Sequence, residues 1–515
     1  MPTRSEEMVV VAVRHRGMLT AAIMLATIMQ VLDTTIANVV LPSMQGGLGA
    51  SLDTITWVLT SYIVAAAIMT PVTGWLSDRF GRRRLFLTSV TGFTIASVLC
   101  GLASGIEQMV LFRVLQGVFG AALVPLSQSV LLDINPKERH GQAMALWGAG
   151  IMVGPIIGPT LGGWLTEVLD WRWVFYINLP VGILAFAGIL IFMPEIAKRA
   201  RRFDFFGFTM LAVALGSLQM ILDRGQQLDW FSSVEIWIES GLLAATLWIF
   251  VIHTATTHEG FIDPGIFKNR NFVTGLIFIF IIGIILLASM ALLPPMLQKL
   301  MGNSTISTGL VLAPRGIGTM VSMIVVGRLI RKIDPRLLIF AGLLLMVWSL
   351  WAMTGFTLAM GHGPVIESGL IQGLGLGLVF VPLSTISFAT LEARFRTDAA
   401  SLFSLVRNLG SSIGVSVVFT MLARNTQVYR ASLVEHITPF NPSLYLPGMA
   451  VPGPGAEQAL MLFDMEVSRQ AAMIAYLNDF RLMMFITLAA IPMLLLLRHP
   501  RRPAQPTADA AALAD

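Results

Sequence analysis

The chain has 515 residues, of which 55% are hydrophobic and only 12% are charged, and its mean hydropathy is +0.77. A water-soluble globular protein carries about 25% charged residues, so this composition excludes that class. The single cysteine, Cys100, excludes an internal disulfide and a cysteine-rich metal site.

Apolar segments recur along almost the whole length and predict an all-α polytopic membrane protein. Each is long enough for a helix to cross a hydrocarbon core of about 30 Å. Read in chain order, they give fourteen predicted membrane-spanning helices, at residues 17–41, 54–77, 84–104, 107–132, 141–166, 172–194, 204–223, 234–256, 272–298, 308–331, 336–359, 364–391, 399–423 and 481–498.

Basic residues alternate between the loops as the positive-inside rule requires of a chain whose termini are both cytoplasmic. The loops assigned to the cytoplasm carry clusters such as Arg79 to Arg84, Lys198 to Arg202 and Arg328 to Arg336, whereas the opposite loops hold few basic residues. One span more or fewer would scramble this pattern. Topology therefore explains the net charge of +5, and nucleic acid is not a predicted partner.

The sequence also repeats itself. Gly327 follows Gly74 by 253 positions in a weaker copy of the same loop, and Gln372-Gly373 follows Gln116-Gly117 by 256. Parallel repeats of six helices are one way in which secondary transporters are built. The predicted organisation is a cytoplasmic N-terminus (1–16), an N-terminal six-helix bundle (17–197), two extra transmembrane helices with linkers (198–271), a C-terminal six-helix bundle (272–498) with a long periplasmic loop (424–480), and a disordered cytoplasmic tail (499–515).

That long loop contains a stretch with amphipathic helical character from Glu457 to Phe480. A partner-docking surface and a loosely packed cap are both compatible with its composition.

An acidic residue within the first apolar span is the first candidate for function. Asp33 lies in a run from about Leu19 to Leu41 that contains no other charge. Burying an ionised carboxylate there costs a few kcal/mol, so such residues usually face a water-filled cavity or a partner. We predict that Asp33 is a proton-binding group; the alternative is a fixed counter-ion that holds two helices together.

Arg113 lies about six residues into the fourth span from the outside, and Asp33 lies about nine residues from the outer end of the first. At about 1.5 Å per residue these depths nearly match, so the two side chains are predicted to face one another across the cavity. The guanidinium would favour the ionised carboxylate, whereas desolvation would favour the neutral acid. Arg113 and Gln116 would then form a relay or tune the site. A permanent structural ion pair is the alternative.

The loop between the second and third spans is a candidate conformational lock. Its glycines permit close helix approach and a tight turn, and its charges permit ion pairs: Gly74, Asp78, Arg79, Gly81, Arg82 and Arg83. We predict that Asp78 pairs with Arg82 or caps the neighbouring helix, in a contact between bundle halves that forms in one conformation and breaks in the other. A topology signal alone would explain the arginines but not the glycines or Asp78.

The fifth span combines small residues at helical spacing with two prolines. Its glycines form a flat face for close helix packing, and its prolines bend the helix and remove backbone hydrogen bonds. We predict a hinge or a tight seam at the interface between the bundles, formed by Gly150, Gly154, Pro155, Gly158, Pro159, Gly162 and Gly163.

Other polar residues within spans are candidates for a substrate cavity with methionine and phenylalanine walls: Gln30, Asn38, Gln372 and Arg407. Arg407 is predicted to reach the cavity or Gln372. Together with Arg113 and Arg315, it gives the spans three arginines against one clear, deeply placed acid, Asp33. This balance predicts a preference for neutral or weakly acidic amphiphiles over multivalent cations.

Motifs of soluble enzymes are absent from the sequence. There is no Walker A loop, no Gly-x-Ser-x-Gly elbow and no His-Glu-x-x-His. Neither enzymatic activity nor a cofactor is predicted, and a proton gradient is the expected energy source.

Several stretches resemble a known family. Residues 74–84 resemble the signature loop of the major facilitator superfamily, residues 150–163 the antiporter motif of its drug exporters, and residues 32–42 the first-helix motif of its fourteen-span drug:proton antiporters. Residues 222–233 and Pro439-Phe-Asn-Pro442 resemble the EmrB-type branch. The resemblance covers almost the whole chain and implies a major facilitator fold of two six-helix bundles plus two extra helices.

The resemblance implies export of hydrophobic, structurally varied toxic compounds across the bacterial inner membrane in exchange for protons, by alternating access. It also implies a periplasmic membrane-fusion adaptor of the EmrA type and a TolC-like outer-membrane channel. Family roles pass to Asp33, Arg113, Asp78 and the fifth-span glycines. Arg331 stands where the second-half loop of the family has an aspartate, so only the first-half loop is expected to form the lock.

Two alternatives stay open at this point. One is an exporter dedicated to a single endogenous lipid or fatty acid, and the other is a non-transporting membrane sensor.

Overall fold

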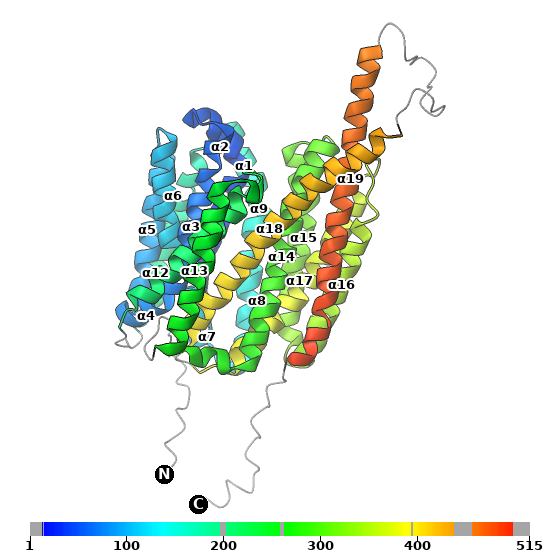
Figure 1. Ribbon diagram of the computed structural model, residues 1–515. Helices are drawn as coiled ribbons and strands as arrows, with labels where there is room; N and C mark the ends of the chain where they lie inside the picture. Colours follow the sequence, from blue (N-terminus) through cyan, green and yellow to red (C-terminus); the bar gives the residue numbers. More distant parts are fainter. Residues whose placement is uncertain are drawn as a thin grey trace, which may run out of the picture.

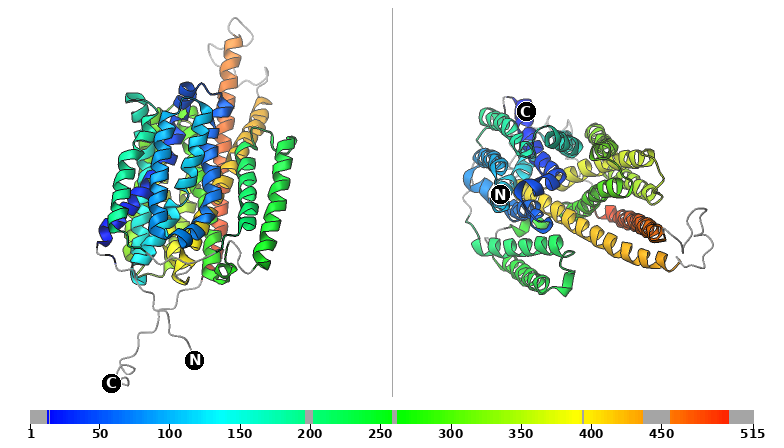
Figure 2. Two further views of the ribbon diagram at one scale, coloured as in Figure 1. Left: turned by 90° about the vertical axis from the view of Figure 1, so that its left-hand side faces the viewer. Right: turned by 90° about the horizontal axis from the view of Figure 1, so that it is seen from above.

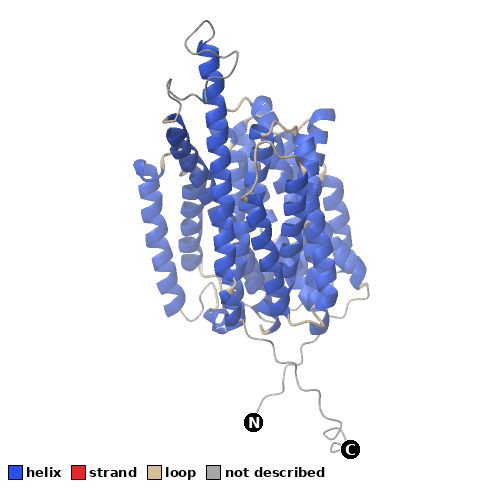
Figure 3. Cartoon of the chain, turned by 90° about the vertical axis from the view of Figure 1, so that its right-hand side faces the viewer, coloured by secondary structure: helices blue, strands red, loops and turns tan. Residues whose placement is uncertain are grey.

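The chain forms a long bundle of nearly parallel and antiparallel helices (Figure 1). The computed structural model describes residues 13, 15–195, 202–257, 262–392, 395–436 and 456–497. Within these ranges every regular element is a helix (Figure 3). Fourteen segments are long and apolar enough to cross a membrane, which confirms the predicted fold class and the predicted number of spans.

Some predicted features lie outside the described residues. They are the N-terminal segment up to residue 12, the basic residues 198–201 of the linker, the Pro439-Phe-Asn-Pro442 motif and the tail from residue 499. The predicted domain boundaries stay predictions.

The helices before residue 193 pack together and are called the first bundle. They are α1 (Arg16–Leu48), α2 (Leu52–Ile55), α3 (Trp57–Met69), η1 (Thr70–Val72), α4 (Thr73–Phe80), α5 (Arg82–Leu102), α6 (Ile106–Gly120), α7 (Leu123–Ile134), η2 (Lys137–Arg139), α8 (His140–Ile151), α9 (Val153–Val168), α10 (Trp173–Tyr176) and α11 (Asn178–Phe192). Breaks inside the apolar segments divide several spans into two helices, for example α8 and α9 at Met152.

The helices after residue 263 form the second bundle. They are η4 (Pro264–Lys268), α14 (Arg270–Pro295), the π-helical turn η5 (Met296–Leu300), α15 (Thr305–Leu329), α16 (Pro335–Met353), α17 (Gly363–Ala389), α18 (Arg396–Val434), α19 (Ala456–Ala490) and η8 (Pro492–Leu496). The bundle end at which α1 begins and η8 ends is called the terminal side, and the opposite end the far side (Figure 1).

The helices α12 (Phe205–Arg224), η3 (Trp230–Ser232) and α13 (Val234–Thr256) form an extra pair beside the two bundles (Figure 2). A hydrogen bond between Thr60 and Asp223 joins α12 to α3, and Arg224 pairs with Glu235 across the pair. The side chains of Trp237 and Trp248 on α13 are largely exposed. Large apolar groups at the outer surface of a membrane helix are stable because lipid covers them.

Helix occupies both flanks of the loop predicted at residues 424–480. α18 continues to Val434 and α19 begins at Ala456, so the predicted helical stretch from Glu457 is confirmed and the helix that precedes the loop is longer than the predicted span 399–423. Residues 424–434 are polar, with Arg424, Asn425 and Gln427 among them, and hydropathy does not mark such a sequence as helix. Backbone hydrogen bonds continue the helix past the end of the apolar run.

Candidate functional site

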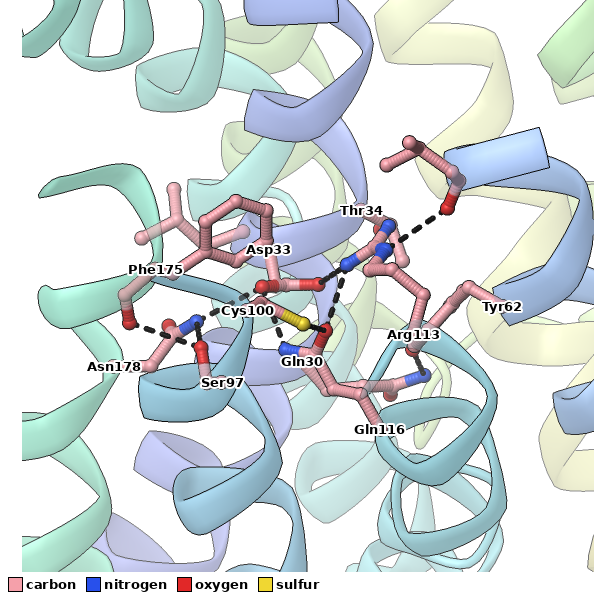
Figure 4. Close-up of polar contacts among 12 residues, drawn as sticks. Gln30, Asp33, Thr34, Tyr62, Ser97, Cys100, Arg113, Gln116, Phe175 and Asn178 are labelled. Carbon is pink, nitrogen blue, oxygen red and sulfur yellow. Dashed lines mark hydrogen bonds and ion pairs between the residues drawn. The ribbon is translucent and has the colours of Figure 1, made fainter. Parts of the chain in front are cut away.

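The charge site of the first bundle is built around Asp33 on α1 and Arg113 on α6 (Figure 4). The Arg113 guanidinium donates to Asp33 Oδ2 at 2.7 Å, and each residue is only 1% exposed. The prediction that these residues lie at matching depth and face one another is confirmed. A cation held against a carboxylate makes the buried pair electrically neutral, which is how a membrane helix tolerates an acid at this depth.

Two amides complete the carboxylate's contacts. Gln116 donates to Asp33 Oδ1 at 2.9 Å, and Asn178 of α11 donates to the same oxygen at 2.9 Å. The Asn178 amide also donates to Ser97 of α5, at 2.9 Å. Four spans of the first bundle therefore contribute to the site around Asp33, and three N–H donors are directed at its two oxygens.

Arg113 is fixed as firmly as its partner. Its Nε donates to the Val58 carbonyl on α3 at 3.0 Å. Its Nη1, which donates to Asp33, also donates to Gln116 Oε1 at 2.8 Å. The guanidinium carbon lies 4.6 Å from the centre of the Tyr62 ring, and the Tyr62 hydroxyl accepts a hydrogen bond from Gln30 at 3.2 Å. The face of the Tyr62 ring stabilises the cation.

One part of the prediction for this pair is wrong. Asp33 and Arg113 do not meet across a cavity between the bundles, because every partner of the two side chains belongs to the first bundle. A residue of α1 projects either toward the second bundle or toward its own bundle, and span depth alone does not distinguish these directions. Here Asp33 projects into its own bundle.

The glycines of the fifth span also face a different neighbour from the one predicted. Side chains at Gly154, Gly158 and Gly162 would collide with Val31, Thr35 and Ile36 of α1, the helix that carries Asp33. The Thr35 hydroxyl donates to the Gly154 carbonyl at 3.3 Å. Gly150 similarly meets Met24, whereas a side chain at Gly163 would meet no atom within 4 Å. The glycine face therefore packs α9 against α1 inside the first bundle.

The seam between the bundles uses other residues of the same span. Gly316 and Gly309 of α15 lie against Ile156 and Thr160 of α9, and Gly327 lies against Ala145 of α8. Pro155 stands in the first turn of α9, where a proline is tolerated, and Pro159 lies inside the helix. A one-residue break in this span lies at Met152, between the two helices, and the predicted hinge stays a prediction.

A charged bridge at the terminal side joins the two bundles. Asp133, at the end of α7, pairs with Arg82 of the first bundle and with Arg396 of the second, the latter at 2.8 Å. Ser129 and Thr397 hydrogen-bond at 3.0 Å beside it. Arg82 thus pairs with Asp133 of a neighbouring helix, and the two predicted roles of Asp78, a pair with Arg82 or a cap on the neighbouring helix, stay predictions.

The glycines of the lock act as predicted on the backbone. Gly81 ends α4 with φ at +89°, a conformation that favours glycine, so the chain can turn directly into α5. A side chain at Gly74 would collide with Asp398 in the first turn of α18, so this glycine permits the close approach of the bundles. Arg79 is exposed, Asp78 is partly buried, and Arg83 donates to the Leu190 carbonyl of α11 at 2.5 Å.

The four candidates for a substrate cavity do not form one site. Asn38 is exposed and donates to the Thr34 carbonyl of its own helix at 2.9 Å, and Gln30 contacts Tyr62. Gln372 is 1% exposed, and neither atom of its amide has a hydrogen-bond partner among the described residues. Of the two alternatives predicted for Arg407, the contact with Gln372 is not formed.

Sequence reasoning missed Asn178, Ser97, Asp133 and Arg396. Asn178 is an amide in an otherwise apolar span, which is a usable signal for a buried polar contact. Asp133 and Arg396 lie just beyond predicted span ends, where charged residues are ordinary, so their pairing depends on helix packing that the sequence does not display.

Comparison with known proteins identifies the family. A model of the Major Facilitator Superfamily matches residues 23–415. The chain belongs to the major facilitator superfamily. It is 38% identical over 431 residues to the multidrug export protein EmrB of Escherichia coli (strain K12), which covers 82% of this chain and 84% of EmrB. It is 36% identical over 487 residues to the fatty acid resistance protein FarB of Neisseria gonorrhoeae, which covers 93% of this chain and 96% of FarB.

These relatives place the chain in the EmrB-like branch of the superfamily, as a multi-pass membrane transporter and not an enzyme. Solved structures agree on the fold. The human organic anion transporter MFSD10 superposes with a TM-score of 0.59 at 16% identity, covering 91% of this chain and 99% of MFSD10. A double-tryptophan mutant of XylE gives the same TM-score at 14% identity, covering 96% of this chain and 98% of XylE.

Proposed function

We propose that this chain is a proton-driven antiporter that exports hydrophobic and amphiphilic toxic compounds by alternating access. The observation that carries the proposal is the buried pair of Asp33 and Arg113. A carboxylate inside a membrane span is a group that can exist in two charge states, and its neighbours here bind only one of them. The relationship to the multidrug export protein EmrB supports the same class of substrate.

Proton binding and the present contacts of Asp33 exclude one another. Its Oδ2 accepts from Arg113, whose guanidinium keeps its own protons at any physiological pH. A proton on Asp33 would leave a buried cation without its counter-charge, which is strongly destabilising. Protonation therefore favours separation of α1 from α6, and the close contact of α1 with Gly154 transmits this movement to α9.

We infer that the terminal side faces the cytoplasm, because the basic loops gather there. The bridge of Arg82, Asp133 and Arg396 then closes the cytoplasmic end of the transporter. In the proposed cycle, Asp33 takes up a proton from the periplasmic side as the drug leaves. Release of that proton to the cytoplasm restores the pair and resets the site. The pump would lie in the bacterial inner membrane and draw on the proton gradient.

A dedicated fatty acid exporter is the second candidate function. It is favoured by the similarity to FarB, a fatty acid resistance protein, along 93% of this chain. A broad substrate screen separates the two proposals, because a dedicated exporter would transport fatty acids and few other amphiphiles.

We further propose that the chain is the inner-membrane part of a tripartite pump, with an adaptor of the EmrA type and a TolC-like outer-membrane channel. α19 extends past the neighbouring helices at the far side (Figure 1) and exposes Met461, Leu462 and Met465 there. Exposed apolar side chains on a projecting helix suit a protein partner. A cysteine at Met465 is expected to cross-link to a co-expressed adaptor, whereas a cysteine at Trp237 on the extra pair is not.

The deciding experiment for proton coupling is efflux of a fluorescent amphiphile from proteoliposomes under an imposed pH gradient. Asp33→Asn keeps the shape of the side chain and removes its charge. We expect it to abolish gradient-driven efflux while the dye still binds. Asp223→Asn, a matched loss of an acid on α12, is expected to leave efflux unchanged.

Gradient-driven pumping by Asp33→Asn at the rate of the unmodified protein would refute the assignment and leave Asp33 as a structural counter-ion. If the unmodified protein does not move the dye but moves a fatty acid, the second candidate replaces the first.

A further inference from the structure

The second bundle contains a counterpart of the charge site in which the acid is missing. The offset of 253 positions that relates Gly74 to Gly327 also relates Tyr62 to Arg315, and the offset of 256 relates Gln116 to Gln372 and Arg113 to Gly369. Packing confirms the correspondence: a side chain at Gly117 would collide with the carbonyl oxygen of Tyr62, and one at Gly373 with the carbonyl oxygen of Arg315.

The two sites differ in where the cation originates. In the first bundle the guanidinium comes from α6 and lies against the Tyr62 ring on α3. In the second bundle the position of the arginine is taken by Gly369, and the guanidinium comes from Arg315 on α15, at the position of the tyrosine. Gly369 and Arg315 are neighbours, since a Cβ at Gly369 would lie in ordinary contact with the Arg315 Cβ, at 3.5 Å.

No acid among the described residues pairs with this second guanidinium. Arg315 is 7% exposed and donates to the Leu286 carbonyl at 3.2 Å and to the Ser289 hydroxyl at 2.9 Å, both on α14. α14 is the repeat counterpart of α1, which supplies Asp33. Among the described residues Arg315 has no carboxylate partner, and a cation buried in a membrane bundle without a counter-charge is costly.

Gln372 of α17, the repeat counterpart of Gln116, supplies an amide to the second bundle. Gln116 uses its amide to hold Asp33 and Arg113, whereas the amide of Gln372 has no hydrogen-bond partner among the residues the structure describes. The second bundle thus repeats the two kinds of donor, guanidinium and amide, that hold a carboxylate in the first. Arg315 is carried by α15, the helix whose Gly316 contacts Ile156 of α9 at the seam between the bundles.

We propose that Arg315, Gln372 and Ser289 bind the carboxylate of an amphiphilic substrate, in the place that Asp33 takes in the first bundle. This site rests on the proposed export function and narrows its substrates to those with one acidic head and an apolar body. The donors are buried in the present conformation, so the carboxylate reaches them when the bundles part along α9 and α15. The substrate carboxylate would then neutralise Arg315 in the second bundle, as Asp33 neutralises Arg113 in the first.

The test compares two ligands that differ only in charge, dodecanoate and methyl dodecanoate, by equilibrium binding of the radiolabelled compounds to the full-length protein in nanodiscs. Arg315→Gln is expected to weaken dodecanoate binding at least about tenfold, the effect of losing a charge-assisted hydrogen bond. Binding of methyl dodecanoate is expected to change by less than about twofold. Arg315→Lys keeps the charge and should retain most of the preference for the acid.

Gln372→Leu supplies an independent variant that preserves the charge and approximate size of the site. It is expected to weaken the binding of dodecanoate several-fold relative to the binding of methyl dodecanoate. Arg224→Gln removes an arginine from the extra pair and should leave both ligands unaffected. A parallel loss of both ligands in Arg315→Gln and Gln372→Leu, or an unchanged ratio between them, would overturn the proposal.

The readout also separates this site from the export function, because equilibrium binding needs no gradient. If dodecanoate binding depends on Arg315 but the unmodified protein shows no gradient-driven efflux, the carboxylate site stands and the antiporter proposal fails. If efflux requires Asp33 but the preference for the acid is independent of Arg315, the antiporter stands and the carboxylate site fails.

Discussion

At the scale of single residues, the central feature is a carboxylate and a guanidinium that neutralise one another inside the first bundle. Removing one partner of such a pair strands the other charge, whereas removing both leaves a neutral polar contact. Arg113→Gln is expected to destabilise the protein by ~3–5 kcal/mol. Adding Asp33→Asn should recover much of this loss, so the two effects are far from additive.

Thermal unfolding in detergent checks this prediction by comparing the two single variants with the double variant. Arg224→Gln and Glu235→Gln, alone and together, provide the matched cycle for a partly exposed pair, where the coupling should be below about 1 kcal/mol. Additive losses at Asp33 and Arg113 would mean that water reaches the site and screens the two charges.

The residue scale also shows what a sequence reveals about such a site. The depth of Asp33 and Arg113 followed from the helix rise, because both lie in apolar spans with clear ends. The direction of Asp33 did not follow, because depth along a helix axis does not fix which way a side chain points around that axis. Asn178 was not singled out from the sequence, and only the packing of α11 on α5 and α1 brings it to the carboxylate.

At the scale of helices, close packing of α9 on α1 depends on single glycines. A side chain at Gly154 would lie 3.1 Å from the backbone nitrogen of Leu32, which cannot turn aside as a side chain can. Gly154→Ala is therefore expected to push α1 away next to Asp33, lowering both thermal stability and the rate of gradient-driven efflux. Gly163→Ala, on the same helix but without a neighbour within 4 Å, should change neither thermal stability nor the rate of efflux.

Melting temperature and efflux measured on both glycine variants decide this point. A loss for Gly163→Ala equal to that for Gly154→Ala would show that helix propensity or lipid contact, and not the approach of α1, limits substitution in this span.

Helix positions were the most predictable part of the fold, for a physical reason. An apolar run in a membrane must satisfy its backbone hydrogen bonds internally, so hydropathy locates the spans within a few residues. The same signal ends where the membrane ends, and it missed the polar continuation of α18 to Val434. It also could not assign neighbours: the glycine face of α9 was expected at the bundle interface, but packs on α1.

At the scale of the whole molecule, the two bundles are joined at the terminal side by one acid shared between two arginines. Asp133 lies on the first bundle, Arg396 opens α18 of the second, and the Ser129–Thr397 hydrogen bond lies beside them. Hydrogen bonds to charged groups contribute ~1.5–3 kcal/mol, and the equilibrium between conformations shifts about tenfold for every 1.4 kcal/mol. A bridge of this strength can set which conformation dominates and still break during the proposed transport cycle.

Asp133→Asn should therefore shift the resting population toward a conformation open at the terminal side by about tenfold or more. A cysteine at Thr397 reports this opening through its rate of modification by a water-soluble maleimide, since Cys100 is buried and contributes no competing signal. Glu235→Gln breaks an ion pair of the same chemistry on the extra pair and is expected to leave the rate unchanged. Equal rates with and without Asp133 would mean that apolar packing of α8 and α9 on α15, and not the charged bridge, holds the terminal side closed.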